Sequence, residues 1–461
     1  MLGAWASPRS QGDAWTIRAR VFCFILIPIL YFPRGLFMSP MDQTSPREKR
    51  PPFSTSFFYG WVIVAVSAFT LFFSGPGQTY SVSTFIDSYI SEFGWSRSLV
   101  SGMYSMGTLA AGLTMGVMGN LFDRRGHRVM TTVVAVSLGL ACLWMSVVSN
   151  STMLLVGFLL IRLLGQGSMS LSSSTLPPQW FITRKGLALS LASLGGVISS
   201  AFLPPLNTWI IRNYGWQMGW RTWAVLLVVV MAPVAYFIIR DRPEDVGLWP
   251  DGVERSWKSS DSAGIVVEDD AWTVREAMGT RSFWLLLFCR MIPSAIVTGL
   301  VFHQVSVMAE VGLPVESAAL VLSAMALVRL PVVLVAGQIA DRVPPRFLIA
   351  GAQGGLLVGM AALLLASSVE TALVYGAMIG VVMSFEIIAG GVIWPEYYGR
   401  LHLSSIRGVS MMAGVIGSAL GPLPYGFAYD VFGSYNQAII ISMVFPLLGV
   451  VAAMMATRPA K

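Results

Sequence analysis

Four charged residues lie deep inside long apolar stretches of this 461-residue sequence: Arg162, Arg290, Arg329 and Glu386. An unpaired ion inside a bilayer costs several kcal/mol, so such residues are usually retained for function. Three guanidinium groups against one carboxylate leave a positive excess, which an anion entering from water could neutralise. Because a planar guanidinium donates two parallel hydrogen bonds to a carboxylate, we expect this anion to be a small organic acid.

The same residues also allow a purely structural interpretation. In this alternative Arg162 pairs with Glu386, while the other two arginines extend toward the membrane surface or cap helix ends. Arg290 fits the alternative best, because it lies only about a third of the way into its apolar stretch. Arg329 fits it least, because it is centred in its stretch and Pro331 follows it.

The elements that carry these charges have the length and composition of transmembrane helices. The chain is 55% hydrophobic and 11% charged, with a mean hydropathy of +0.69, which indicates an all-α integral membrane protein. Twelve apolar stretches are bounded by charge, Pro or Gly. They cover about 60–86, 98–122, 129–149, 152–180, 186–211, 217–239, 282–309, 316–340, 347–368, 371–398, 406–429 and 434–456.

The turns between these stretches predict the topology. Nine basic residues fall in the even-numbered turns, against three (Arg97, Arg212 and Arg221) in the odd ones; the nine are Arg124, Arg125, Arg128, Arg184, Lys185, Arg342, Arg346, Arg400 and Arg407. By the positive-inside rule the even-numbered turns and both termini are cytoplasmic. We therefore expect a multi-pass protein of the cell membrane, in the inner membrane if the chain is bacterial.

The domain organisation follows from the spacing of the apolar stretches. We expect six-helix bundles at 57–240 and 281–461, joined by a cytoplasmic linker at 241–280, where the acidic residues concentrate. Residues 1–56 read as a cytoplasmic, disordered extension, since their one apolar run, Val21 to Phe32, is too short to span. An alternative is that translation begins at Met38 or Met41.

Several function classes are disfavoured by the composition. The net charge of +7 reflects loops on one side of the membrane, so a nucleic-acid partner is not expected. The three cysteines, Cys23, Cys142 and Cys289, have neither metal-type nor paired spacing. No Walker-type loop, nucleophile or metal cluster is present in the sequence, so we expect neither an enzyme nor a cofactor. We expect the lipid bilayer to surround the protein. We also expect a monomer.

One ten-residue turn occurs twice, 218 residues apart. Gly119 to Arg128 (GNLFDRRGHR) and Gly337 to Arg346 (GQIADRVPPR) share the opening Gly, the Asp-Arg pair and the closing Arg. Each lies between the second and third apolar stretches of its half, which indicates an internal duplication.

Two such halves resemble the major facilitator superfamily of transporters. The resemblance implies twelve transmembrane helices in two pseudo-symmetric bundles and secondary transport by alternating access. It also implies that Gly119 allows close helix packing, while Asp123, Arg124 and Arg128 form a charge relay that gates the conformational change. Asp341 and Arg342 would be the second, weaker set.

A narrower resemblance rests on Arg329-Leu330-Pro331, which is similar to the substrate-binding Arg motif of monocarboxylate transporters and oxalate/formate exchangers. Further similar segments are Phe58-Tyr59-Gly60-Trp61, Phe93-Gly94-Trp95-Ser96-Arg97, Gln179 to Gly186, Arg242 to Gly247 and Arg281-Ser282-Phe283-Trp284. Arg162 to Gly167 resembles the superfamily's fourth-helix Arg motif, which is linked with coupling and the central cavity. The resemblance implies a small organic anion, most of all a monocarboxylate, with Arg329 as its partner.

The sequence also departs from that family. Met325 stands where monocarboxylate transporters have an Asp, and the first helix has no Lys between Gln78 and Thr84. The eleventh helix lacks the Lys that oxalate/formate exchangers use against a second carboxylate, so monoanions are favoured. Coupling to protons would need Glu386 or His303 as the titrating group; coupling to a counter-anion is the alternative.

Two further positions could serve either structure or function. Gln78 and Tyr80 follow Gly75-Pro76-Gly77, and a broken helix often borders the binding site of a transporter; a plain kink would need no ligand. His303 could titrate, or it could be a hydrogen-bonded structural residue.

Two other functions compete with organic-anion transport. An exporter of drug-like amphiphilic compounds would have a cavity of aromatic and Met side chains with few arginines. A non-transporting membrane sensor on the same scaffold would need no central charges, and would add a soluble output domain that the sequence does not contain.

Overall fold

The structure is a computed structural model that describes residues 57–252 and 272–460, and the statements below concern these residues. The expectations for residues 1–56, including the alternative starts at Met38 and Met41, lie outside the described residues. So does the middle of the linker.

The first bundle contains six membrane passes, several of which are divided into consecutive helices. Its elements are α2 (Gly60–Phe73), η1 (Gly75–Gly77), α3 (Thr79–Phe93), α4 (Arg97–Leu113), α5 (Met115–Arg125), α6 (His127–Met145), α7 (Ser151–Ile161), η2 (Arg162–Met169), α8 (Ser170–Thr175), α9 (Pro177–Trp180), α10 (Lys185–Tyr214), α11 (Trp216–Leu226), η3 (Leu227–Met231) and α12 (Ala232–Ile238).

The second bundle follows three short elements of the linker, η4 (Pro243–Val246), η5 (Pro250–Gly252) and α13 (Val274–Met278). It also contains six passes. Its elements are α14 (Arg281–Phe302), α15 (Gln304–Glu310), α16 (Val315–Ala340), α17 (Pro345–Leu364), α18 (Val369–Tyr398), α19 (Leu403–Leu420), α20 (Pro422–Phe432), α21 (Asn436–Ser442) and α22 (Val444–Met455).

Among the described residues, 11 helices are long and apolar enough to cross a membrane. The remaining pass consists of α4 and α5, whose apolar part covers Leu99–Leu113. The prediction of an all-α membrane protein is therefore confirmed. The first pass is longer than expected from hydropathy, because α3 continues to Phe93 through the polar residues Asp87, Ser88 and Glu92.

Polar side chains cap the N-termini of several of these helices. Asn150 accepts a hydrogen bond from the Met153 amide at the start of α7 (2.9 Å), and Ser96 accepts one from the Leu99 amide at the start of α4 (3.2 Å). Such caps satisfy amide groups that have no partner within the helix. They fix where each pass begins, and hence the depth of every side chain along it.

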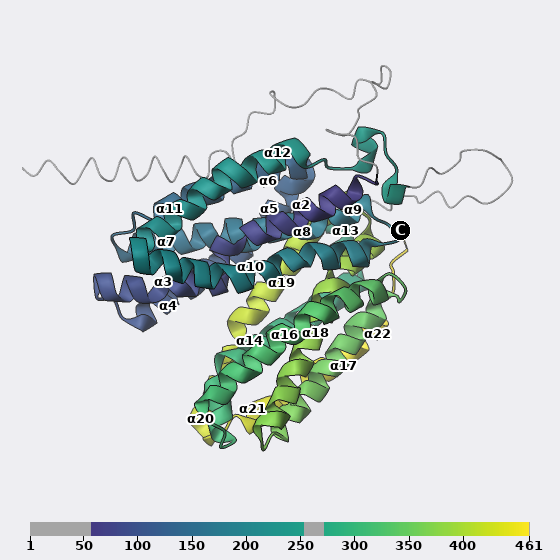
Figure 1. The fold of residues 1–461 in the computed structure, drawn as a ribbon. Helices are drawn as coiled ribbons and strands as arrows, with labels where there is room; N and C mark the ends of the chain where they lie inside the picture. Colours follow the sequence, from purple (N-terminus) through teal and green to yellow (C-terminus); the bar gives the residue numbers. More distant parts are fainter. Residues whose placement is uncertain (1–56, 253–271, 461) are drawn as a thin grey trace, which may run out of the picture.

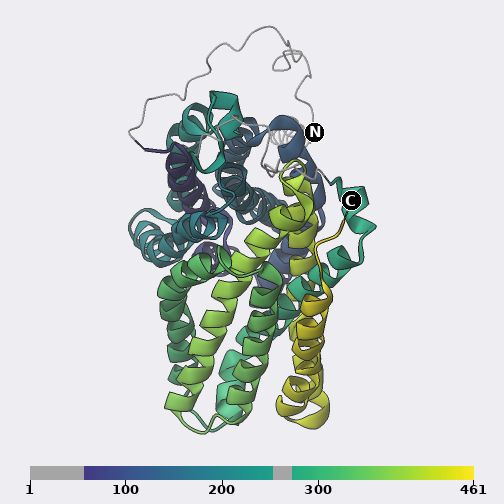
Figure 2. The same cartoon turned by 90° about the vertical axis from the view of Figure 1, so that its right-hand side faces the viewer.

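The two bundles meet at one end of the molecule and diverge toward the other (Figure 1). They meet where α8, α9 and α13 lie, and they diverge toward α3 and α4 in one bundle and α20 and α21 in the other. Figure 2 views the molecule from the end where the bundles meet, with the purple-to-teal bundle above the green-to-yellow bundle. We call the end where they meet the turn face, since it carries the turns after α5 and α16.

The outer ends of the described chain also lie at the turn face. The Tyr59 hydroxyl beside the start of α2 donates to the Ile238 carbonyl at the end of α12 (2.8 Å). The Tyr397 hydroxyl at the end of α18 donates to the Ala456 carbonyl after α22 (2.8 Å). An even number of passes explains why both ends lie on one face.

Candidate functional site

Arg162 is buried within the first bundle, where neutral groups surround its guanidinium. Nε donates to Thr108 Oγ1 (3.0 Å), and one terminal nitrogen donates to the Gly77 carbonyl (3.0 Å) and to Thr79 Oγ1 (3.2 Å). The ring of Tyr104 lies 4.9 Å from the guanidinium carbon, a cation–π distance. Arg162 therefore joins the fourth pass to the break in the first pass, and it does not pair with Glu386.

The break itself explains this position. Gly75–Gly77 form a single 3-10 turn, which leaves the Gly77 carbonyl free to accept from Arg162. A β-carbon on Gly77 would lie 2.1 Å from the Ile161 carbonyl oxygen, so only glycine fits here. Arg162 also starts the π-helical segment η2, a type of irregularity that is frequent at functional sites.

Gln78 and Tyr80 lie directly after the break and bond within the first bundle. Gln78 Nε2 donates to Ser74 Oγ (3.0 Å) and to Ser170 Oγ (3.2 Å). The Tyr80 hydroxyl donates to Ser199 Oγ (2.9 Å). Both side chains are half-buried, and these bonds hold the broken pass against α8 and α10.

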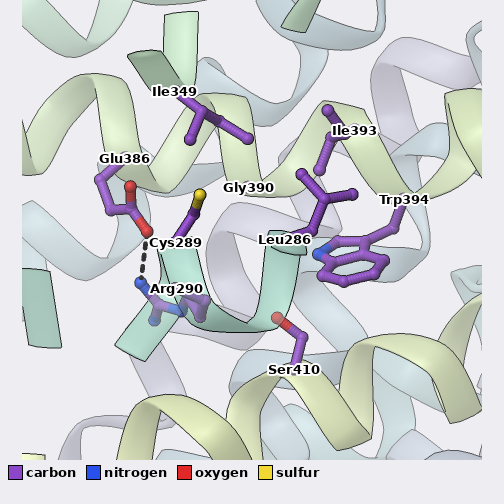
Figure 3. A pocket seen from close by; sticks show the side chains of 9 residues that line it. All are labelled: Leu286, Cys289, Arg290, Ile349, Glu386, Gly390, Ile393, Trp394 and Ser410. Atoms are coloured by element: carbon purple, nitrogen blue, oxygen red, sulfur yellow. Dashed lines mark hydrogen bonds and ion pairs between the residues drawn. The ribbon is translucent and has the colours of Figure 1, made fainter. Parts of the chain in front are cut away.

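Arg290 and Glu386 form an ion pair inside the second bundle. A terminal nitrogen of Arg290 in α14 lies 3.1 Å from Glu386 Oε1 in α18, with side-chain exposures of 34% and 8%. The pair borders a cavity of about 10 Å³, room for about one water molecule. Figure 3 shows the pair beside Cys289 and Ser410; the full lining is Leu286, Cys289, Arg290, Ile349, Glu386, Gly390, Ile393, Trp394 and Ser410.

Arg407 belongs to the same region, although its position in the sequence suggests a turn. It lies four residues after the start of α19, and it donates to the Gly390 carbonyl of α18 (2.9 Å). It also lies within electrostatic range of Arg290. The expectation that Arg407 is a turn residue is therefore wrong. The internal duplication could have predicted this. Lys185 starts α10, and the position 218 residues later is Leu403, the first residue of α19.

Arg329 in α16 differs from the other arginines of the interior. Its Nε is buried and has no hydrogen-bond partner among the described residues. It lies on the same face of α16 as Ala336 and Ala340, by helical spacing. That face packs against α10 of the first bundle near the turn face, where Ala340 Cβ comes within 3.0 Å of a β-carbon built on Gly186. Arg329 lies about three turns beyond this contact, on the side where the bundles diverge.

His303 lies between α14 and α15, at the end of the second bundle that is remote from the turn face. Nε2 lies 3.2 Å from the Pro422 carbonyl oxygen, and Nδ1 lies 3.4 Å from the Tyr435 hydroxyl. Both ring nitrogens therefore have partners that connect α14 with α20 and α21. Within the described chain, no group of three or more His, Cys, Asp and Glu side chains could hold a metal ion.

At the turn face, Asp123 of the first bundle caps a helix of the second. Its two carboxylate oxygens accept hydrogen bonds from the amides of Ser404 (3.0 Å) and Ser405 (2.7 Å), in the first turn of α19. The negative charge also interacts favourably with the positive end of the helix dipole. Gly119 makes this approach possible, since a β-carbon there would lie 2.1 Å from the Ser404 carbonyl oxygen.

Asp341 of the second bundle caps a helix of the first bundle in the same way. Its oxygens accept hydrogen bonds from the amides of Gly186 (2.6 Å) and Leu187 (3.0 Å), in the first turn of α10. Burial raises the pKa of the Asp341 carboxyl, and these two amides and Lys185 act against that rise. Asp123 and Asp341 lie 218 residues apart, and so do the amides that they bind. The duplication seen in the turns therefore extends to their partners.

The other residues of the two turns have different environments. Arg124 and Arg342 are exposed. Arg128 stays within the first bundle, where its Nε donates to the Tyr236 carbonyl (2.7 Å) and its amide donates to Asp241 Oδ1 (2.8 Å). In this conformation the aspartates contact the opposite bundle through backbone amides.

Further polar contacts join the bundles at the turn face. Gln179 Nε2 donates to the Arg400 carbonyl, and Arg400 donates back to the Gln179 carbonyl, both at 2.8 Å. Lys185 pairs with Glu396 at 2.9 Å, and Glu244 of the linker lies 3.6 Å from Arg400. The turn face is thus closed by hydrogen bonds and ion pairs between the two bundles.

Two pseudo-symmetric bundles that cross a membrane, joined at one face by reciprocal helix caps, define a polytopic transporter scaffold. The profile of the Major Facilitator Superfamily matches residues 19–179 and 67–422. The chain belongs to this superfamily and is a multi-pass secondary transporter with a small-molecule substrate and ion coupling. It is not an enzyme.

The chain is similar to two curated proteins over most of its length. It is 25% identical over 376 residues to the uncharacterised MFS-type transporter YhjX of Escherichia coli, covering 78% of this chain and 85% of that protein. It is 25% identical over 404 residues to monocarboxylate transporter 13 of Rattus norvegicus, covering 85% and 87%. Among solved structures, the chain is similar to the Major Facilitator Superfamily transporter FucP in the outward conformation. The match covers 87% of this chain and 100% of the FucP chain, with a TM-score of 0.62 and 14% identity. The similarity to FucP shows the fold.

Proposed function

We propose that this protein transports a small organic anion, most of all a monocarboxylate, by alternating access. The observation that carries the proposal is Arg329, whose Nε is buried in a membrane-crossing helix without a partner among the described residues. A buried, unsatisfied donor on a charged group is costly. A carboxylate that accepts two hydrogen bonds from the guanidinium would remove that cost.

The contrast with the other arginines supports this assignment. Arg162 has three hydrogen bonds to neutral acceptors, and Arg290 has Glu386. Substrate binding at either of them would have to displace existing partners, whereas the Nε of Arg329 has no partner in the described part of the chain. The similarity to monocarboxylate transporter 13 agrees with an anionic substrate.

The turn face is the cytoplasmic side in this proposal. It carries the basic residues of the even-numbered turns, as the positive-inside rule requires. The conformation described here is then outward-facing, because the bundles meet at the cytoplasmic side. Gly119, Asp123 and Asp341 act as the gate, whose contacts must break before the substrate is released into the cell.

Reconstituted vesicles provide the direct test. Uptake of labelled formate, acetate, lactate, pyruvate and benzoate is measured with and without an imposed pH gradient, together with a neutral ester of each acid. We expect at least one acid to enter faster than into protein-free vesicles, and we expect no such difference for its ester. An inward pH gradient should accelerate uptake if protons are coupled, and internal unlabelled acid should accelerate it if a counter-anion is exchanged. Uptake of drug-like cations without uptake of any acid would contradict the proposal.

A further inference from the structure

The second bundle places three arginines at successive distances from the turn face. Counted along their helices at 1.5 Å per residue, Arg407 lies roughly 6 Å, Arg290 roughly 14 Å and Arg329 roughly 17 Å from the helix end at that face. Glu386 pairs with Arg290 and neutralises its charge. Arg407 therefore adds one uncompensated positive charge to that of Arg329. This excess charge lies between the proposed binding residue and the turn face.

Arg407 has a neutral partner, and the opposite bundle covers it. Its hydrogen-bond acceptor is the Gly390 carbonyl, and it has no carboxylate partner among the described residues. A β-carbon built on Gly391 would lie 3.4 Å from an Arg407 terminal nitrogen and 2.8 Å from Leu189 Cδ1 of α10. Leu189 is buried among side chains of the second bundle. The guanidinium therefore lies directly beneath the contact between the bundles.

The small cavity connects Arg407 with the ion pair. Gly390, which accepts the hydrogen bond of Arg407, also lines the cavity together with Arg290 and Glu386. Ser410, one helical turn after Arg407, lines it from α19 (Figure 3). When α10 separates from α16 and α18 at the turn face, Leu189 must leave Gly391. Arg407 and this cavity then become open to that side.

We propose that Arg407 and Arg290 form a second anion-binding position, which receives the substrate carboxylate after the turn face opens. This inference rests on the proposed function and adds a site to it. In the conformation described here the position is closed and Glu386 neutralises Arg290. In the opposite conformation the Arg407 guanidinium attracts the anion toward the turn face, so the substrate passes from Arg329 to this pair before it is released.

A charge-selective labelling experiment tests the position without knowledge of the substrate. Ser410→Cys is introduced after Cys23, Cys142 and Cys289 have each been replaced by alanine. The introduced thiol is treated from the turn face with two methanethiosulfonate reagents of similar size, one anionic and one cationic. The ratio of the two rates reports the local potential, because the acidity of the thiol affects both rates equally.

We expect the anionic reagent to react faster, and we expect Arg407→Gln to lower the ratio about fivefold, since a nearby unit charge is removed. Arg407→Lys keeps the charge and should retain the ratio. The matched control is Asn120→Cys, an exposed position on α5 whose ratio should not respond to Arg407→Gln. An unchanged ratio at the Ser410 position, or reaction only from the side opposite the turn face, would overturn the proposal.

A second variant keeps the test informative if Arg407→Gln does not fold. Leu189→Ala removes the side chain that covers Gly391, so both reagents should react faster with the introduced thiol while their ratio stays the same. If Leu189→Ala leaves both labelling rates unchanged, Leu189 does not cover this position, and the proposal is contradicted. If the vesicles transport no acid but the labelling results hold, the proposed function fails and the anion-attracting position remains.

Where an acid is transported, its kinetics give a third measurement. Arg407→Gln should raise the KM measured from the turn face about fivefold, and should change the KM from the other side by less than about twofold. An equal rise from both sides would assign Arg407 to the same site as Arg329 and would contradict a second position.

Discussion

At the scale of single residues, the interior arginines differ in what balances their charge. Arg162 is satisfied by neutral oxygen atoms and the Tyr104 ring, and Arg290 by Glu386. Arg329 has an unpartnered Nε in the described structure. A sequence shows that each residue is embedded, but the partner of each one comes from another helix. The pairing of Glu386 with Arg290, where the structural alternative had Arg162, could therefore not be read from the sequence.

The first prediction concerns Arg329. Arg329→Lys keeps the charge but cannot donate two parallel hydrogen bonds, so it should weaken carboxylate binding about tenfold or more. Equilibrium binding of the transported acid to purified protein measures this effect. Arg212→Gln, an exposed position at the end of α10, is the control and should bind as the unmodified protein does. Unchanged affinity in Arg329→Ala would move the site to Arg162 or Arg290.

The second prediction concerns Glu386, the embedded carboxylate. If protons are coupled, Glu386 must exchange its partner during the cycle, so that substrate competes with it for an arginine. Glu386→Gln should then abolish the acceleration by an inward pH gradient while exchange of labelled for unlabelled acid continues. His303→Ala is the comparison, since His303 bonds to Pro422 and Tyr435. Gradient-driven uptake that survives both substitutions would exclude a relay through either residue.

At the scale of elements, hydropathy predicted the passes well, because a bilayer requires long uninterrupted apolar helices. The break at Gly75–Gly77 was also predictable, since Gly and Pro interrupt a helix at known positions. The target of Asp123 was not, because it binds backbone amides of α19, and every helix start offers such amides. Arg407 was misplaced because the residues around it do not mark the start of α19 at Leu403, which only the 218-residue repeat of Lys185 indicates.

The third prediction tests the close approach of α5 to α19. A β-carbon on Gly119 would lie 2.1 Å from a backbone oxygen, so Gly119→Ala must push the two bundles apart at the turn face. Spin labels at the exposed positions Asn120 and Phe347, one in each bundle, should report a longer distance. Gly102→Ala in α4, where a β-carbon meets nothing within 4 Å, is the matched control. No change in distance with Gly119→Ala would show that this contact does not hold the turn face closed.

At the scale of the whole molecule, the two halves close the turn face in the same way. Asp123 reaches from the first bundle to α19, and Asp341 reaches from the second bundle to α10. Residues of one bundle therefore cap a helix of the other in both directions. Because each cap breaks when the bundles separate, the caps stabilise one end state of the cycle and contribute nothing to the other.

The fourth prediction is that the two caps act additively on the conformational equilibrium and leave substrate affinity nearly unchanged. Asp123→Asn and Asp341→Asn each remove a charge from a helix N-terminus, which is typically worth about 1 kcal/mol. Each should therefore shift the equilibrium away from the closed turn face about fivefold, and the double variant about 25-fold, since independent sites add. The distance distribution between the labels at Asn120 and Phe347 measures both shifts.

Transport should slow in each variant while binding of the acid is retained, because both aspartates lie at the turn face and Arg329 lies far along α16. A loss of binding that accompanies the loss of transport would contradict a purely conformational role. A double variant no worse than either single one would show instead that the two caps break in a single concerted step, in which the second cap has no effect once the first is lost.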